Sequence, residues 1–309
     1  MSPPPHSTPL VSILIPTFNH EPFLTQALES ALAQITSFPV EILVGNDAST
    51  DGTGRILDTF ASRFPNRIRA FHAPVNVGGH ANFSQRYAAA RGQYIALLEG
   101  DDYWTDPAKL QLQVDHLATH PACSLCFHQV EIRDEIGTSP IILSNPSDPL
   151  ISGLSRITRF NYIHTASVVF RNQLIPDLPP WVYHLPLGDW PLFILLAEHG
   201  ELHLIRKPMA VYRVQNSSVW ASRTQLSRLI STVHVAEVCL HHLHHPGFRD
   251  CIFKTSRTIA QIARANRQPR QWLAYTAKCA HMAIIQPSIL RTLRKKKHQP
   301  SSKPLTPPE

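Results

Sequence analysis

Tyr94-Ile95-Ala96-Leu97-Leu98-Glu99-Gly100-Asp101-Asp102 is the stretch of this 309-residue sequence that decides the fold. Its first five residues form a short apolar run, which is typical of a buried strand. Three carboxylates follow it, and neighbouring carboxylates repel one another. A bound Mn²⁺ or Mg²⁺ would remove that repulsion, because hard divalent ions prefer oxygen ligands. In open α/β sheets, ligands bind outside the carboxyl ends of the strands. An acidic turn that simply faces solvent is the alternative.

Strands and helices alternate on both sides of this stretch. Apolar runs predict further strands at residues 11–15, 40–44, 67–72, 123–132, 164–170 and 201–214. Capping residues and apolar spacing of about 3.6 residues predict helices that begin near Glu21, Ser49, Gly79, Asp106 and Asp189. This alternation predicts an α/β fold, with a mostly parallel sheet flanked by helices. A mostly helical pattern at residues 220–287 predicts a helical C-terminal appendage.

The sequence divides into four segments. We expect a flexible leader at residues 1–9, an α/β domain at 10–220, a helical region at 221–290 and a basic, disordered tail at 291–309. The leader is rich in Pro and Ser and lacks the basic stretch and apolar core of a signal peptide. No apolar run is long enough to predict a membrane span.

The positive charge is concentrated in the tail. From Arg291 onward there are six Lys/Arg and one Glu, which supply five of the seven net positive charges. This distribution argues against a nucleic-acid partner for the domain. It leaves two interpretations of the tail, a contact with an anionic membrane surface or a solubilising end.

The cysteines indicate a reducing compartment. There are five of them, an odd number in a long chain, which argues against a disulfide framework. Cys123 and Cys126 form a CxxC, but they lie in an apolar run and are predicted to be buried thiols of a strand. We therefore expect a cytoplasmic protein, with peripheral contact to the inner face of a membrane through the tail.

Short polar residues end the first two predicted strands. Thr17, Asn19 and Asp47 would meet at one edge of the sheet, where they could bond a base edge and a ribose. Each is also suited to a turn or a cap. The chain has no GxGxxG after the first strand and no GxxxxGK[ST], so a dinucleotide site or a P-loop is not expected.

Several segments, in this order, resemble family 2 inverting glycosyltransferases. They are residues 11–19 (VSILIPTFN), 46–53 (NDASTDGT), 76–79 (NVGG), 92–104 (GQYIALLEGDDYW) and 188–190 (GDW). The resemblance covers residues 10–220 and implies the GT-A fold and a nucleotide-diphospho-sugar donor, with a UDP-sugar as the first expectation. It does not extend over the helical C-terminal region.

The resemblance also implies roles for individual residues. It places Thr17, Asn19 and Asp47 near the base and ribose of the donor. It makes Asp101, together with Asp102, the metal site and puts Glu99 near the ribose, although the family commonly has Asp at that position. It makes Asp189 the catalytic base, whereas the residue type alone would favour a helix cap.

Other residues could complete the site. His164 and Trp190 could border the acceptor, with Trp190 stacking on a sugar ring; a structural histidine and a core tryptophan are the alternatives. Arg213 suits phosphate oxygens and, with a loop at residues 216–220, could close on the diphosphate, whereas a surface salt bridge would also explain it. The histidines at 241–245 are interpreted as a polar helix end.

The leading functional hypothesis is a metal-dependent inverting glycosyltransferase. It would move a sugar to a hydroxyl of a glycan or lipid-linked acceptor in cell-surface polysaccharide synthesis. One alternative is a sugar nucleotidyltransferase, although residues 16–20 (PTFNH) do not form the Gly-rich basic loop of that class. The other is a non-catalytic nucleotide- or glycan-binding module, which would be favoured if Asp189 were buried far from the acidic turn.

Overall fold

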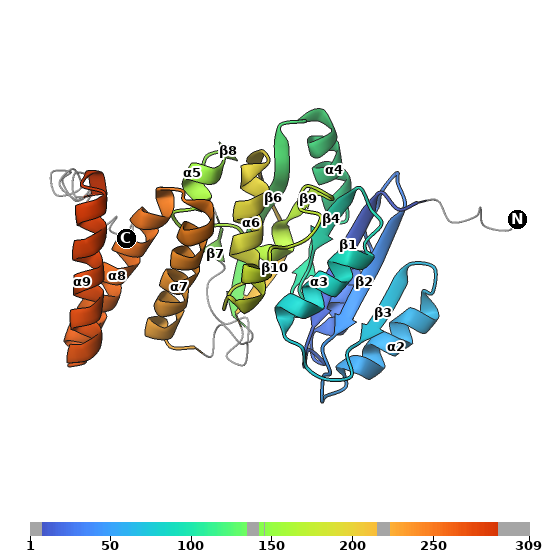
Figure 1. The fold of residues 1–309 in the computed structure, drawn as a ribbon. Coiled ribbons are helices and arrows are strands. Elements are labelled where there is room, and N and C mark those ends of the chain that lie inside the picture. Colours follow the sequence, from blue (N-terminus) through green and yellow to red (C-terminus); the bar gives the residue numbers. More distant parts are fainter. Residues whose placement is uncertain (1–7, 135–141, 145, 215–222, 290–309) are drawn as a thin grey trace, which may run out of the picture. The chain divides into compact units, whose positions relative to one another are not determined.

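A computed structural model describes residues 8–134, 142–144, 146–214 and 223–289 (Figure 1). The predicted loop at 216–220, the basic tail and nearly all of the leader lie outside these residues. The chain divides into two compact units, one up to Arg223 and one from Thr224. Within the described ranges, every helix is too short or too polar to serve as a membrane span.

The first unit is built on a ten-stranded sheet. Eight strands follow one another in the order β3-β2-β1-β4-β9-β6-β10-β5, while β7 pairs with β6 and β8 pairs with β10. The strands are β1 (Val11–Thr17), β2 (Val40–Asn46), β3 (Ile68–His72), β4 (Tyr94–Leu97), β5 (Tyr103–Trp104), β6 (Cys123–Asp134), β7 (Ile142–Leu143), β8 (Ile151–Ser152), β9 (Val169–Arg171) and β10 (Glu201–Val214).

The strand directions put the carboxyl ends of six strands at one edge. β3, β2, β1 and β4 pair in parallel, and so do β6 and β10. β9 is antiparallel to both β4 and β6, which makes β6 and β10 run in the same direction as β1. The predicted parallel sheet is therefore confirmed in its two main blocks, and β9 joins these blocks as a reversed strand.

Helices cover the sheet where their apolar spacing predicts. In α1 (Leu24–Leu32), the buried residues Leu24, Ala27, Leu28 and Ala31 recur at helical spacing and pack with the interior of β1. The other helices of this unit are α2 (Thr53–Arg63), α3 (Gly79–Ala89), α4 (Lys109–Thr119), α5 (Leu154–Ile157) and α6 (Asp189–Glu198), with short 3₁₀ turns at Thr165–Ser167 and Pro180–His184.

Three boundaries differ from the sequence prediction. The strand expected at 164–170 is a 3₁₀ turn followed by the short β9. The helix expected from Asp106 begins at Lys109, because Asp106 Oδ1 accepts the backbone N–H of Ala108 at 2.8 Å in a local turn. β5 was not predicted, since a two-residue strand has no periodicity of its own and exists through its pairing with β10.

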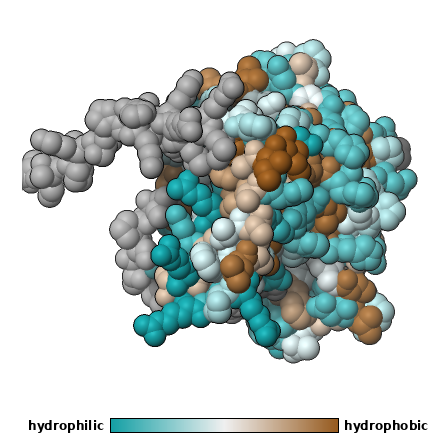
Figure 2. Space-filling view, turned by 60° about the vertical axis from the view of Figure 1, so that its left-hand side comes forward, coloured by the Kyte–Doolittle hydropathy of each residue, from teal (hydrophilic) through white to brown (hydrophobic). Residues whose placement is uncertain are grey.

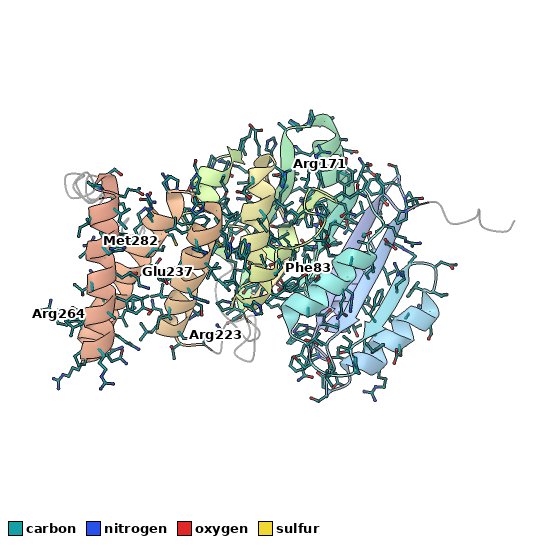
Figure 3. The ribbon with its side chains drawn as sticks, in the orientation of Figure 1. Phe83, Arg171, Arg223, Glu237, Arg264 and Met282 are labelled. Carbon is teal, nitrogen blue, oxygen red and sulfur yellow. The ribbon has the colours of Figure 1, made fainter. Side chains whose placement is uncertain are left out.

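The second unit is helical, as the sequence predicts. It contains α7 (Gln225–Leu243), α8 (Gly247–Ala265) and α9 (Pro269–Ile285). An ion pair of 2.5 Å joins Glu237 of α7 to Lys278 of α9; Glu237 is labelled in Figure 3. Met282 is the buried residue of α9, whereas α8 buries a continuous face.

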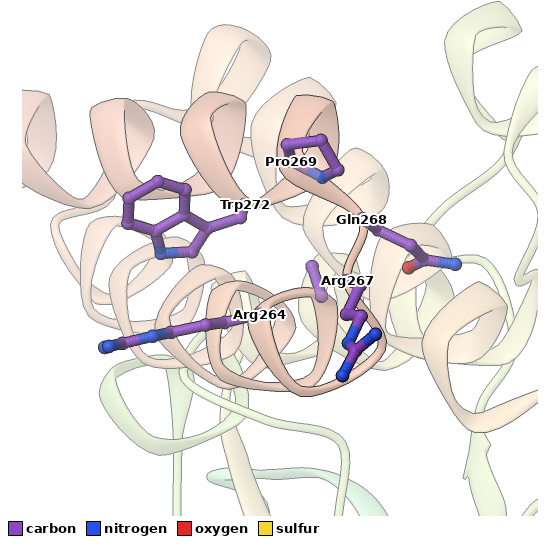
Figure 4. A pocket seen from close by; sticks show the side chains of 6 residues that line it. Arg264, Arg267, Gln268, Pro269 and Trp272 are labelled. Atoms are coloured by element: carbon purple, nitrogen blue, oxygen red, sulfur yellow. The ribbon is translucent and has the colours of Figure 1, made fainter.

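The surface of this unit mixes apolar and polar side chains. α9 exposes Trp272, Leu273, Ile284 and Ile285. A cavity of about 310 Å³ lies where α8 passes into α9, lined by Ala263, Arg264, Arg267, Gln268, Pro269 and Trp272 (Figure 4). Figure 2 shows apolar side chains in separate groups among polar ones, without one dominant apolar patch on the face in view.

Candidate active site

The acidic turn after β4 brings three carboxylates together. Ligand atoms of Glu99, Asp101 and Asp102 all lie within 4.8 Å of one another. Burial, followed by the charges of Asp101 and Asp189, raises the pKa of Glu99 to about 8. Burial and the charges of Asp101 and Glu99 raise the pKa of Asp102 well above its usual range. Asp102 Oδ2 is buried without a hydrogen-bond partner. An oxygen-rich cluster that carries an orphaned buried carboxylate oxygen fits a hard divalent cation.

Arg213 on β10 holds this turn in place. Its backbone N–H donates to Asp102 Oδ1 at 2.9 Å, and its Nη1 donates to the carbonyl oxygen of Asp101 at 2.5 Å. Its guanidinium also bonds Gln26 and lies 4.5 Å from the centre of the Tyr103 ring. The side chain predicted to contact phosphate is thus used, in this structure, to anchor the acidic turn.

Asp47 ends β2 and organises the loop before α3. Its Oδ1 accepts the backbone N–H of Val77 at 2.7 Å, and its Oδ2 accepts that of Gly78 at 2.9 Å. Gly78 has a φ of 84°, a conformation that favours glycine. The buried Asp47 carboxylate therefore fixes a loop at the carboxyl edge of the sheet, next to the place predicted for the donor.

Thr17 and Asn19 lie at the end of β1 and in the loop that follows. Thr17 Oγ1 is buried and has no hydrogen-bond partner; it lies against Gly100, where an added Cβ would come within 2.7 Å of it. Asn19 Oδ1 accepts the backbone N–H of Thr50 at 2.8 Å, which ties the loop after β1 to the loop after β2. Because the side-chain oxygen of Asn19 is used within the loops, its amide nitrogen is the atom that could contact a nucleotide-sugar donor.

Asp189 is the first residue of α6 and lies near the acidic turn. Its Oδ2 accepts a hydrogen bond from Asn161 Nδ2 at 3.0 Å. Burial raises the pKa of Asp189, and its charge in turn raises the pKa of Glu99. An Asp189 remote from the acidic turn would have favoured a non-catalytic module, whereas here the charge of Asp189 acts on the pKa of Glu99 in that turn.

His164 packs against Tyr212, and the charges of the acidic turn act on Tyr212. The two rings are 5.0 Å apart, centre to centre. Burial, followed by the charges of Glu99 and Asp102, raises the pKa of Tyr212. Burial lowers the pKa of His164 to about 4, so its ring is neutral at pH 7. The predicted acceptor histidine is thus brought to the site as an uncharged group.

Trp190 does not lie where the prediction requires. Its ring is 1% exposed, and its Nε1 donates to the carbonyl oxygen of Ile157 at 2.7 Å. A ring enclosed in this way has no face to offer to a sugar. Trp190 is therefore a core residue and not the predicted acceptor contact. The apolar residues that follow it in α6 are buried as well.

Trp190→Ala should therefore lower the free energy of unfolding by about 3–5 kcal/mol, the usual cost of removing a large buried aromatic side chain. Urea unfolding followed by circular dichroism measures this change. Phe18→Ala is the control in the same unit, because Phe18 is 38% exposed and should change the free energy by less than about 1 kcal/mol. Equal effects of the two substitutions would contradict the core assignment.

The sequence analysis missed two histidines of the site. His20 Nε2 lies 3.9 Å from Asp101 Oδ2, and its Nδ1 is buried without a partner. His80 Nε2 lies 2.6 Å from the carbonyl oxygen of Leu185, and an added Cβ on Gly188 would come within 2.8 Å of the His80 ring. His20 follows directly on the strand-end segment, which was the available signal. Nothing in the local sequence of His80 indicated its position beside Asp189.

Comparisons with known proteins bear on the family and the fold of this chain. The family model described as Glycosyl transferase family 2 matches residues 12–175. An uncharacterized protein of Mycobacterium tuberculosis is 40% identical over 213 residues, which are 69% of this chain and 61% of that protein. The chain thus spans less than two thirds of the length of this relative.

Two solved structures share the fold at low sequence identity. S. aureus TarS, residues 1–349 in complex with UDP-GlcNAc, has a TM-score of 0.60 at 14% identity, over 93% of this chain and 92% of that one. The mannosyltransferase PcManGT of Pyrobaculum calidifontis, in complex with GDP-Man and Mn²⁺, has a TM-score of 0.56 at 18% identity, over 94% and 80%. These likenesses show the GT-A fold, and the family model covers more than half of the sequence. The chain belongs to glycosyl transferase family 2.

Proposed function

We propose that this chain is an inverting glycosyltransferase. It would transfer a sugar from a nucleotide-diphospho-sugar, with a UDP-sugar as the first expectation, to a hydroxyl of a glycan or lipid-linked acceptor in polysaccharide synthesis. The observation that carries the proposal is the cluster of Glu99, Asp101 and Asp102 at the end of β4. The charge of Asp189 raises the pKa of Glu99 in this cluster. The nucleotide-sugar complexes of TarS and PcManGT support a donor of this class.

Asp101 and Asp102 would hold Mn²⁺ or Mg²⁺. Their geometry supports this, because Asp102 Oδ2 is buried without a protein partner and Asp101 is partly exposed beside it. The ion, when bound, neutralises the charge that develops on the departing diphosphate. Arg213 would hold the turn in place for the ion, because it bonds the side chain of Asp102 and the backbone of Asp101.

Asp189 would act as the base. The acceptor hydroxyl must lose its proton as it attacks, and a carboxylate beside it can take that proton. Burial raises the pKa of Asp189, which makes the carboxylate a stronger base than an exposed one. Attack from the face opposite the diphosphate inverts the anomeric centre, through an oxocarbenium-like transition state of the kind met in glycoside hydrolysis.

The strand-end residues would bind the donor. Thr17 Oγ1, which has no hydrogen-bond partner, and the amide nitrogen of Asn19 would contact the donor. Asp47, which holds the loop at Val77 and Gly78, would shape the nucleotide side of the site. Glu99 would contact the ribose. His164, neutral and near Tyr212, would border the acceptor.

A donor screen tests the proposal. Hydrolysis of UDP-, GDP- and dTDP-sugars in Mn²⁺ should single out one nucleotide and release the nucleoside diphosphate. Release of pyrophosphate from a nucleoside triphosphate and a sugar phosphate would establish the nucleotidyltransferase alternative. Donor binding without turnover, with or without short glycan acceptors, would establish the binding module.

Asn161→Ala should move the acidic limb of the pH–rate profile to higher pH. The base must be ionised, so the rate rises with pH through the pKa of Asp189. The Asn161 hydrogen bond favours the ionised form, and its loss raises that pKa further. Initial rates measured as a function of pH report the change. Asn172→Ala is the matched control, because Asn172 Nδ2 donates to Gly92 at 2.8 Å and not to a site residue. An acidic limb that does not move in Asn161→Ala would contradict the assignment of the base.

We further propose that the basic tail gives peripheral contact with an anionic membrane, where lipid-linked acceptors lie, and that the catalytic domain is cytoplasmic. Each Lys or Arg near such a surface contributes about 1 kcal/mol. Deletion of residues 291–309 should lower binding to phosphatidylserine vesicles at low salt and leave donor hydrolysis unchanged. Equal partitioning of the truncated and full-length chains would make the tail a solubilising end.

A further inference from the structure

A second group of metal-ligating side chains lies at the other end of the sheet from the acidic turn. His116 is in the last turn of α4, Cys123 is the first residue of β6, and His203 is near the start of β10. One ligand atom from each lies within 4.8 Å of the others. The starts of β6 and β10 lie opposite the edge where β4 ends, because these strands run in the same direction.

Hydrogen bonds orient the two imidazole rings. His203 Nε2 lies 2.9 Å from Glu201 Oε2, and His203 Nδ1 lies 2.9 Å from His116 Nε2. A carboxylate accepts and cannot donate, so the Glu201 contact places the ring proton of His203 on Nε2. Its Nδ1 then carries a lone pair that faces His116 Nε2. A carboxylate that fixes the outer nitrogen of a histidine in this way is the usual companion of a metal-bound imidazole.

Hydrogen bonds fix Cys123 and the backbone around it. Its thiol donates to the carbonyl oxygen of Leu125 at 3.2 Å, a bond that an ion can replace. Arg171, labelled in Figure 3, donates from Nε to the carbonyl oxygen of Cys123 at 2.9 Å and from Nη2 to that of Leu117 at 2.6 Å. Burial raises the pKa of the Cys123 thiol to about 12, so the thiol keeps its proton until a bound ion displaces it.

We propose that His116 Nε2, His203 Nδ1 and Cys123 Sγ form a structural Zn²⁺ site that ties the end of α4 to the starts of β6 and β10. Zn²⁺ takes His nitrogen at about 2.0–2.1 Å and Cys sulfur at about 2.3 Å, so the two histidine nitrogens, now 2.9 Å apart, would separate slightly, to about 3.3 Å, on binding. The exposed His120 lies beside the site, and its ring stacks on His116 with the ring centres 4.1 Å apart.

The binding step balances in protons. The Cys123 thiol releases one proton to solvent, and the sulfur–zinc bond forms. The ring proton that His116 Nε2 shares with His203 moves through solvent to His116 Nδ1, and both nitrogens then donate their lone pairs to the ion.

The site differs in chemistry from the acidic turn, so the two can be tested apart. Nitrogen and sulfur donors select zinc and cobalt, whereas the acidic turn offers oxygen alone. Co²⁺ is the probe, because a cobalt–thiolate bond gives a charge-transfer absorption that oxygen and imidazole ligands do not give. The full-length chain is titrated with Co²⁺ in excess Mg²⁺, which occupies the acidic turn, and Zn²⁺ is then added as competitor.

We expect one equivalent of Co²⁺ to give the thiolate absorption, and Zn²⁺ to abolish it. Cys123→Ser should remove it, and His116→Gln should weaken binding by more than about 100-fold. Cys279→Ser is the control, because Cys279 is the cysteine that is not buried and lies outside the group. Absence of the absorption in the unmodified chain, or its persistence in Cys123→Ser, overturns the proposal.

Thermal unfolding gives a second measurement that does not depend on cobalt. Zn²⁺ at 100 times its Kd should raise the melting temperature by about 5–10 °C in the unmodified chain and in Cys279→Ser. The rise should be absent in His116→Gln, a variant at a partly exposed position that is expected to fold. A rise that persists in His116→Gln would place the ion elsewhere, such as at the histidines of residues 241–245, and would overturn the proposal.

Discussion

Asp189→Asn is expected to lower the rate of sugar transfer by about 10²–10⁴-fold, the usual contribution of a general base. Asparagine keeps the shape of the side chain but cannot accept the acceptor's proton at neutral pH. Donor affinity should stay within about threefold, because Asp189 is proposed to act on the acceptor. Single-turnover rates measure the first quantity, and calorimetric titration with the donor measures the second.

Asp177→Asn is the matched control for this experiment. Asp177 is exposed, lies on the same part of the chain and has no proposed role in the site, so its amide variant should transfer sugar at the normal rate. A near-normal rate in Asp189→Asn would move the base to another residue, while a loss of donor affinity equal to the loss of rate would assign Asp189 to donor binding.

Asp101→Ala should lower turnover by at least about 10²-fold. A metal ion contributes several kcal/mol to the stabilisation of charge in the transition state, and each 1.4 kcal/mol corresponds to a factor of ten. The fold should survive, because Asp101 is partly exposed and holds Arg213 through its backbone carbonyl rather than its side chain. Steady-state rates and the melting temperature check both parts.

Chelation tests the role of the metal ion separately from that of the Asp101 side chain. Excess EDTA should abolish the activity of the unmodified enzyme, and Mn²⁺ or Mg²⁺ added beyond the chelator should restore it. Asp101→Ala should need much more Mn²⁺ for any residual activity. Full activity in excess chelator would show that the acidic turn works without an ion.

The sequence was sufficient where the signal is local. The strand predicted at 201–214 is observed with the same bounds, and the acidic turn follows β4 as expected. Asp189 begins a helix and lies near the turn. Short apolar runs and strand–helix alternation carry this information, because they reflect burial along a few consecutive residues.

The sequence was insufficient where a role depends on a distant partner. Arg213 was assigned to phosphate, and its partner Asp102 lies 111 residues earlier in the chain. Both carboxylate oxygens of Asp47 are taken by the backbone of Val77 and Gly78, a geometry that no spacing indicates. Trp190 could equally have been a sugar platform or a core residue, and the packing around it decided for the core.

The bond between Arg213 and Asp102 has a consequence for the nascent chain. The acidic turn leaves the ribosome 111 residues before its anchor, and at a synthesis rate of about 5–20 residues per second the delay is about 5–20 s. During that interval β1 to β4 can pair, while the three carboxylates lack the strand that fixes them. The region matched by the family model ends at residue 175. It contains β1 to β4 and the acidic turn, but it lacks β10, which carries Arg213. Synthesis of β10 is thus the step that supplies the anchor of the acidic turn.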